Sequence, residues 1–205
     1  MINPAIFKAY DVRGTYPDQL NEEAAHAIGG ALVAHLGVSH VAVGRDMRVS
    51  GPALSAALIR GIVEQGADVT EIGLCSTDEL YFAVGKFGYP AGVMVSASHN
   101  PANYNGFKFC RENAIPISSE TGLDAIRDIA LKGPLQPKPT QGTVHTRDVL
   151  ADFARHVLSF IDPAKVRPLR LCIDAGNGMA GLVVPAVFKS LPCEVTPLFF
   201  ELDGR

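Results

Sequence analysis

The sequence has no tryptophan, no long apolar run and no excess of positive charge. None of its apolar stretches approaches the roughly 20 residues that a membrane-spanning helix needs, and its N-terminus lacks the apolar core of a signal peptide. The formal net charge of -3, from 18 Lys+Arg against 21 Asp+Glu, gives no basic field of the kind that nucleic-acid binding requires. We therefore expect a cytoplasmic protein that binds neither membranes nor nucleic acid.

Cysteines are few and widely separated. Cys75, Cys110, Cys172 and Cys193 show no C-x-x-C spacing and lie inside or beside apolar runs. A disulfide framework or a zinc site would require closer pairs and histidine partners. We predict four buried free thiols.

Apolar periodicity divides the first part of the chain into alternating helices and strands. Helices are predicted over 21–36, 50–64, 77–87 and 118–130, and strands over 41–43, 68–72 and 91–95. Residues 106–110 follow a polar, turn-rich stretch and predict a short antiparallel edge strand. This order predicts an α/β fold, with a mixed, mostly parallel sheet sandwiched by helices.

A proline-rich segment separates this part from the rest. Residues 132–142 hold three prolines and two glycines, so we expect a first α/β domain over 1–132, a linker over 133–145 and a second α/β domain over 146–205. The last region contains two predicted helices, 148–160 and 179–191, and two strands, 169–173 and 193–200. Because an open α/β sheet needs more strands than two, we expect an N-terminal portion of a longer protein, prone to self-association through its incomplete second domain.

The strongest chemical signal is the segment 93–101, in which an apolar strand runs into Ser-Ala-Ser-His-Asn-Pro. Ligands of parallel sheets collect outside the carboxyl ends of strands, where this loop would lie. Ser98, next to His99, could act as a nucleophile or carry a covalent phosphate, which needs cations around it. Cations are available at Lys108, Arg13, Arg45 and Arg48. The alternative is a simple turn, since Asn-Pro favours turn initiation.

Three other segments allow two interpretations each. Residues 43–51 place two arginines before a predicted helix, which favours either an anion site or a surface network around a helix cap. Residues 10–14 form a polar segment that is either only a turn or a part of a functional site. Residues 176–181 match G-x-G-x-x-G, but Asp174 would crowd a pyrophosphate there, so a tight strand-to-helix connection is favoured over dinucleotide binding.

Four of these segments together resemble the α-D-phosphohexomutase family, and most closely its bacterial phosphomannomutase and phosphoglucomutase members. The matching segments are 7–14, 44–51, 96–108 and 174–178, in the family's order. The resemblance implies reversible interconversion of hexose 1-phosphate and 6-phosphate through a phosphoserine, with hexose 1,6-bisphosphate as intermediate and activator. Residues 73–82 and 111–118 look more like the mannomutase branch and favour mannose phosphate over glucose phosphate as substrate.

The resemblance also implies roles for individual residues. Ser98 would be the phosphoserine and a ligand of Mg²⁺, with His99 and Lys108 as catalytic neighbours. Substrate or phosphate contacts would come from Tyr10, Arg13, Arg45, Arg48 and Asn100. The family's other magnesium ligands lie in an Asp-Gly-Asp-x-Asp-Arg loop that this sequence lacks, so we expect the chain alone to lack turnover. The alternative is a short protein that binds phosphosugars or a partner without catalysis.

Overall fold

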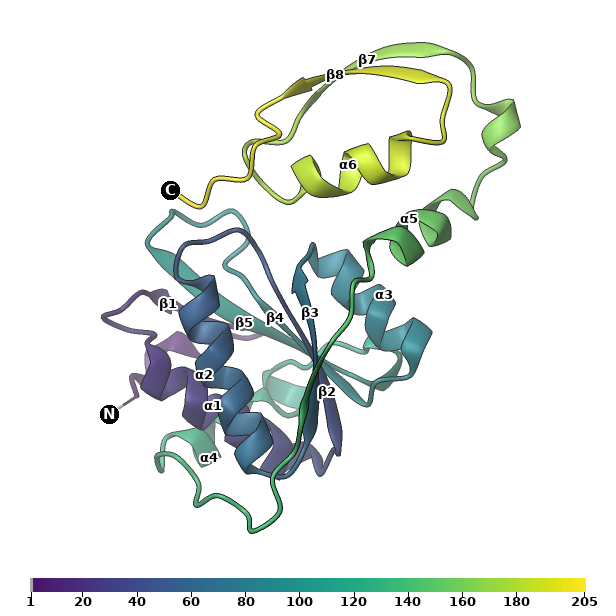
Figure 1. The fold of residues 1–205 in the computed structure, drawn as a ribbon. Helices are drawn as coiled ribbons and strands as arrows, with labels where there is room; N and C mark the ends of the chain where they lie inside the picture. Colours follow the sequence, from purple (N-terminus) through teal and green to yellow (C-terminus); the bar gives the residue numbers. More distant parts are fainter. Residues whose placement is uncertain (1) are drawn as a thin grey trace.

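The computed structural model describes residues 2–205 and contains two sheets (Figure 1). The strands are β1 (Val12–Thr15), β2 (His40–Arg45), β3 (Asp68–Leu74), β4 (Ala91–Val95), β5 (Tyr104–Arg111), β6 (Val144–Thr146), β7 (Leu169–Asp174) and β8 (Cys193–Leu198). The α-helices are α1 (Glu22–Leu36), α2 (Gly51–Glu64), α3 (Thr77–Phe87), α4 (Leu123–Ala130), α5 (Leu150–Leu158) and α6 (Ala180–Phe188). No helix in the described part of the chain is long and apolar enough to cross a membrane.

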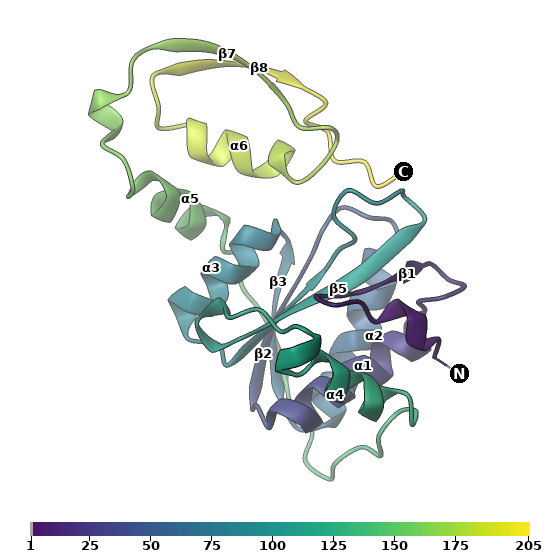
Figure 2. The ribbon, with the colours of Figure 1, turned by 180° about the vertical axis from the view of Figure 1, so that it is seen from behind.

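The larger sheet has six strands in the order β1-β5-β4-β2-β3-β6. Strand β2 pairs in parallel with β3 and β4, and β3 pairs in parallel with β6, whereas β5 runs antiparallel to β4 and β1. One apolar cluster joins α1, α2 and α4 to one face of this sheet, and a second joins α3 to the other face (Figures 1 and 2). The predicted mixed, mostly parallel sheet between helices is confirmed.

Local signals fix where the helices begin. The side chain of Asn21 accepts a hydrogen bond from the backbone of Ala24 at 3.0 Å, which caps α1 as its sequence predicts. In α3, Ser76 and Glu79 exchange the two bonds of a capping box. Glu79 is only 1% exposed, and burial raises the pKa of its carboxyl above the ordinary range.

Two strands, β1 and β6, were not predicted from the sequence, and their pairing corrects the predicted sheet. The predicted edge strand, β5, lies inside the sheet, because β1 pairs with its outer side through Val12 and Phe107. Strand β1 lies in the segment that the sequence suggests is only a polar turn. At the other edge, β6 pairs with β3, so the segment expected as a linker over 133–145 contributes Val144 and His145 to the sheet. Both strands are short and gain their pairing from distant residues.

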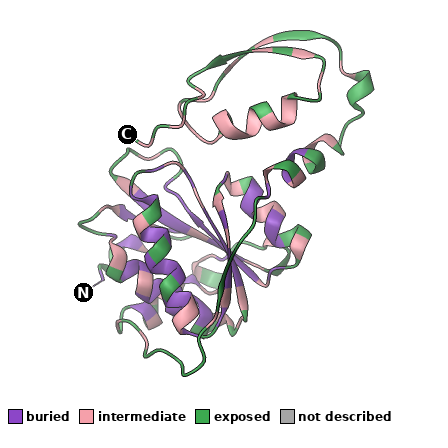
Figure 3. Cartoon of the chain, in the orientation of Figure 1, coloured by how far each residue is buried: buried purple, intermediate pink, exposed green. Residues whose placement is uncertain are grey.

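The second unit consists of α5, the parallel pair β7 and β8, and α6 between them (Figure 1). Its strands and α6 contain no buried residue, in contrast to the core of the first unit (Figure 3). This difference corrects the cysteine prediction. Cys75 and Cys110 are buried free thiols of the first unit, but Cys172 is exposed and Cys193 is partly exposed.

Candidate functional site

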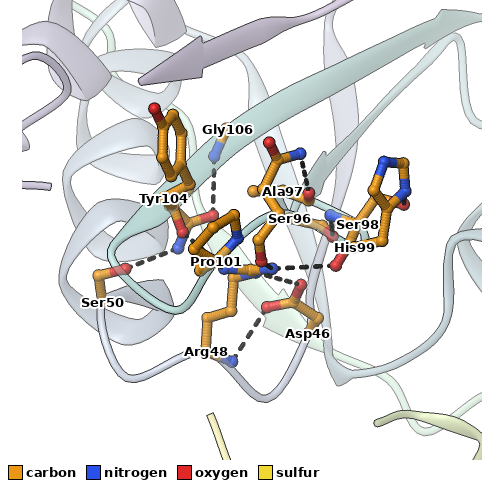
Figure 4. A network of polar contacts seen from close by, with 12 residues as sticks. Asp46, Arg48, Ser50, Ser96, Ala97, Ser98, His99, Pro101, Tyr104 and Gly106 are labelled. Atoms are coloured by element: carbon orange, nitrogen blue, oxygen red, sulfur yellow. Dashed lines mark hydrogen bonds and ion pairs between the residues drawn. The ribbon is translucent and has the colours of Figure 1, made fainter. Parts of the chain in front are cut away.

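The serine loop, residues 96–103, joins β4 to β5 at the carboxyl end of the parallel strands (Figure 4). Ser98 is exposed and has a φ of 55°, a left-handed conformation that is uncommon for residues other than glycine. Its backbone N–H donates to the Oγ of Ser96 at 2.9 Å. The Oγ of Ser98 lies 3.3 Å from Nδ1 of His99. The structure therefore presents the predicted nucleophile to solvent with an imidazole beside it.

Two of the residues expected to contact phosphate make hydrogen bonds within the loop and its support. The Nδ2 of Asn100 donates to the carbonyl oxygen of Ala97 at 2.8 Å. The guanidinium of Arg48, only 4% exposed, donates to four carbonyl oxygens of the chain, those of Ser98, Asn100, Pro101 and Tyr104. Since all four Nη–H groups of Arg48 are used, its side chain has no donor left to reach a phosphate from those nitrogens.

Arg13 and Lys108 converge on a shared carboxylate. The Oδ2 of Asp11 lies 2.5 Å from Nη2 of Arg13 and 3.5 Å from Nζ of Lys108. Lys108 on β5 is paired with Met94 of β4, and Arg13 on β1 is paired with Gly106 of β5. The pairing of three strands thus brings two of the predicted cations together, whereas the sequence analysis did not identify Asp11 as their partner.

The remaining predicted residues lie apart from polar partners. The side chain of Tyr10 is 74% exposed on the turn before β1. Arg45 ends β2 and is partly exposed, and its guanidinium has no hydrogen bond or ion pair among residues 2–205. Both side chains are free to meet a ligand, but the structure itself places neither against Ser98.

A cleft of about 320 Å³ opens between the two units beside Ser98. The first unit lines it with Asp46, Met47, Ser76, Thr77, Met94, Ser96, Ser98 and His99, and the second unit adds Gly178 and Met179. Ser76 and Thr77 begin α3, and Met179 immediately precedes α6. Two helix N-termini, whose dipoles favour anions, therefore face the cleft that holds the serine. Sequence analysis did not bring these two helix starts together, because they lie in different units of the chain and meet only in the folded structure.

No cysteine lines this cleft among residues 2–205. Cys75 is buried beneath it, with its Sγ 3.8 Å from the Sδ of Met94. Burial raises the pKa of the Cys75 thiol far above its ordinary range, which disfavours the thiolate, the nucleophilic form.

The G-x-G-x-x-G segment serves as a connection between β7 and α6. The backbone N–H of Gly176 donates to Oδ1 of Asp174 at 2.8 Å, so this carboxylate occupies a donor that a pyrophosphate would use. A Cβ at Gly181 would overlap the carbonyl oxygen of Phe200, so the glycine permits close packing against the chain that follows β8. These contacts support the tight strand-to-helix connection rather than dinucleotide binding.

The described residues do not form a complete magnesium site. No group of three or more His, Cys, Asp or Glu side chains within residues 2–205 is arranged to hold a metal ion. Mg²⁺ prefers six oxygen ligands, of which Ser98 would supply one.

Comparison with known proteins identifies the family of the chain. The family model for phosphoglucomutase/phosphomannomutase, alpha/beta/alpha domain I, matches residues 4–136. The chain is 47% identical over 200 residues to a protein of Xanthomonas campestris pv. campestris described as phosphohexose mutases, covering 97% of this chain and 44% of the relative. It is 42% identical over 197 residues to a phosphomannomutase of Escherichia coli, covering 95% and 43%.

Solved structures give the same result. A crystal structure of a phosphoglucomutase/phosphomannomutase family protein from Burkholderia thailandensis superposes with a TM-score of 0.88 at 34% identity, covering 100% of this chain and 46% of that one. The family-model match and this superposition together place the chain in the phosphohexomutase class. The chain belongs to the phosphoglucomutase/phosphomannomutase family. It spans less than half the length of the curated relatives it matches.

Proposed function

We propose that this chain forms the phosphoserine-bearing part of a cytoplasmic phosphohexomutase that interconverts hexose 1-phosphate and 6-phosphate. The observation that carries the proposal is the placement of Ser98, exposed in a left-handed turn, with His99 beside it, in a cleft that two helix N-termini face. Phosphoryl transfer depends mainly on positioning and charge neutralisation, which is what such a cleft supplies.

In the proposed step, the Oγ of Ser98 attacks a phosphorus atom of hexose 1,6-bisphosphate. The new Oγ–P bond forms as the bond between phosphorus and the sugar oxygen breaks, and the departing oxygen takes up a proton to give the hydroxyl of a hexose monophosphate. Nδ1 of His99, 3.3 Å from Oγ, is within reach to accept the serine proton as the hydroxyl attacks. The reverse transfer returns the phosphoryl group to the other sugar oxygen.

The cations on β1 and β5 fit a role in charge neutralisation. Arg13 and Lys108 are partly exposed and, among residues 2–205, share a single carboxylate, that of Asp11, so these three residues carry a net positive charge. Tyr10 and Arg45 remain proposed substrate contacts. Mg²⁺, which would stabilise the developing phosphoryl charge when bound, requires ligands beyond Ser98, so we propose that residues 2–205 alone do not turn over substrate.

The test is mass spectrometry of the purified chain before and after incubation with glucose or mannose 1,6-bisphosphate. A mass increase of about 80 Da that peptide mapping assigns to Ser98 would support the proposal. Ser98→Ala should remove the increase, whereas the control Ser159→Ala, at an exposed serine after α5, should leave it unchanged.

If the chain gains no phosphate with glucose 1,6-bisphosphate or with mannose 1,6-bisphosphate, the result would contradict the proposal that this part of the protein accepts a phosphoryl group on Ser98. In that case, thermal stabilisation by hexose phosphates without any mass change would favour the second candidate, a phosphosugar-binding protein without catalysis. The two helix N-termini at the cleft are the observation that keeps this second candidate open.

A further inference from the structure

Arg48 is the most heavily hydrogen-bonded side chain beside the serine loop (Figure 4). Its Nη1 donates to the carbonyl oxygens of Pro101 at 2.7 Å and Tyr104 at 2.8 Å. Its Nη2 donates to those of Ser98 at 2.9 Å and Asn100 at 2.5 Å. One guanidinium thus collects four acceptors from seven consecutive residues of another part of the chain.

The position of Arg48 is fixed from the sheet. Its Nε lies 3.4 Å from Oδ2 of Asp46, and its own backbone N–H donates to Oδ1 of the same carboxylate at 3.0 Å. The backbone N–H of Asp46 in turn donates to the carbonyl oxygen of Val95, the last residue of β4. Arg48 and Asp46 are each 4% exposed, so this ion pair is shielded from water and its geometry is held by buried groups.

The direction of the carbonyls decides the direction of the next N–H groups. In a trans peptide, the C=O of one residue and the N–H of the following residue point to opposite sides. Because the Ser98 carbonyl points at Arg48, the N–H of His99 points away from Arg48. That N–H has no hydrogen-bond partner among residues 2–205, and both Ser98 and His99 are exposed.

We propose that Arg48 is a positioning residue that sets the serine loop for phosphoryl transfer without touching the phosphate. By drawing the loop carbonyls inward, it holds Ser98 in its left-handed turn and directs the N–H of His99 to the exposed side of the loop. This N–H is a single donor for an anion next to the serine hydroxyl, because the neighbouring N–H groups of Ser98 and Asn100 are bonded to Ser96 Oγ and to the Ala97 carbonyl oxygen. The role of this N–H as a phosphate donor rests on the proposed function, whereas the control of loop geometry does not.

Lysine cannot reproduce this arrangement. Its three donors sit on a single nitrogen atom, whereas the planar guanidinium spreads its donors over a fork that matches four carbonyls. Arg48→Lys therefore keeps the positive charge beside Asp46 and releases part of the loop. The matched control is Arg60→Lys, on the exposed side of α2, whose guanidinium lies 4.0 Å from Glu64 and contacts none of the loop.

The experiment measures the rate at which Ser98 gains phosphate from glucose 1,6-bisphosphate as the bisphosphate concentration is varied. For Arg48→Lys we expect the limiting rate to fall by about tenfold to a hundredfold, with a much smaller change in the half-saturating concentration. Arg60→Lys should match the unsubstituted chain. Equal limiting rates for Arg48→Lys and the unsubstituted chain would overturn the proposal.

A second measurement separates this inference from the proposed function. The ¹³Cα and ¹³Cβ chemical shifts of Ser98 report its backbone conformation, whether or not the serine becomes phosphorylated. In Arg48→Lys these shifts should leave the left-handed range and the His99 amide resonance should move, while the resonances of Val43 and Val93 in the sheet stay in place. Unchanged Ser98 and His99 resonances would overturn the inference, even if the unsubstituted chain gains no phosphate.

Asp46→Asn provides a milder variant in case Arg48→Lys does not fold. It removes the charge that fixes Nε but leaves the four carbonyl bonds available, so it should shift the same two resonances by a smaller amount. If Asp46→Asn folds without any change at Ser98 or His99, the proposed chain of positioning from β4 through Asp46 and Arg48 is wrong.

Discussion

Gly61 of α2 lies directly against the backbone carbonyl of His26 in α1, so that a Cβ at position 61 would overlap the carbonyl oxygen. The same two helices are joined by Nε2 of His26 and Oε2 of Glu64 at 2.7 Å. Because the obstructing atom belongs to a helix backbone, it cannot move without shifting α1. We expect Gly61→Ala to lower the free energy of unfolding by about 1 to 3 kcal/mol, measured by urea denaturation.

Gly85→Ala is the matched control for that substitution. Gly85 lies in α3, is exposed, and has open space around the position of a Cβ. Alanine there should raise the free energy of unfolding by about 0.5 to 1 kcal/mol, since it is the better helix former. If Gly61→Ala did not lower the free energy of unfolding relative to Gly85→Ala, the result would contradict the close packing of α1 against α2 at Gly61.

The four thiols should divide into two reactivity classes. Burial raises the pKa of Cys110 to about 12 and raises that of Cys75 further, whereas Cys172 is exposed and Cys193 partly exposed. Since the thiolate is the reactive form, iodoacetamide at mildly alkaline pH should label Cys172 and Cys193 in the folded chain and spare the other two. Unfolding in urea should make all four react, as peptide mass spectrometry would record. Labelling of Cys75 before unfolding would contradict the packing beneath the cleft.

Asp11 should be the group that stabilises the two cations on β1 and β5. Its side chain is 11% exposed and faces both Arg13 and Lys108. Asp11→Asn removes the charge but keeps the volume, so we expect a loss of about 1 to 3 kcal/mol in the free energy of unfolding. The control Asp128→Asn breaks an exposed pair with Arg127 and should cost under about 0.5 kcal/mol. Equal losses in the free energy of unfolding for the two variants would mean that Asp11 stabilises Arg13 and Lys108 no more than an exposed ion pair would.

Most of the fold could be predicted from the sequence because its signals are local. Helix α3 and strand β4 have the predicted bounds, since a capping box and an apolar run bounded by turns mark their ends. Strands β1 and β6 could not be predicted in this way. Each has only three or four residues, and β1 pairs with a strand about 90 residues further along the chain. The residues near β1 in the sequence therefore contain no signal for its pairing with β5.

In the candidate site, too, the features set by local sequence could be predicted, and those set by long-range packing could not. The serine loop is visible as a contiguous motif, and the structure places Ser98 and His99 together. The part played by Arg48 is not visible, because a buried guanidinium bound to carbonyls and an exposed one bound to phosphate look the same in sequence. Likewise, Met179 reaches the cleft only through the placement of the second unit. Such roles depend on tertiary packing rather than on residue type.

The stability of the chain should depend on pH through His40. Burial lowers the pKa of this imidazole, with Asp68 opposing and His145 adding to the effect. Nε2 of His40 lies 2.8 Å from Oγ1 of Thr70, and its ring packs 5.1 Å from that of Tyr89. Below about pH 6.5, the unfolded chain therefore binds a proton that the folded chain still excludes, and the free energy of unfolding falls as the pH falls.

His40→Gln removes this titration but keeps a group that can hydrogen-bond to Thr70. Urea denaturation between about pH 7.5 and about pH 5.5 should show a steeper loss of stability in the unsubstituted chain than in the variant. All other titrating groups are common to both proteins, so the difference between the two curves reports His40 together with its electrostatic coupling to Asp68 and His145. Parallel curves would mean that His40 takes up its proton equally readily in the folded and unfolded chains, which would contradict the effect of its partial burial at the amino end of β2.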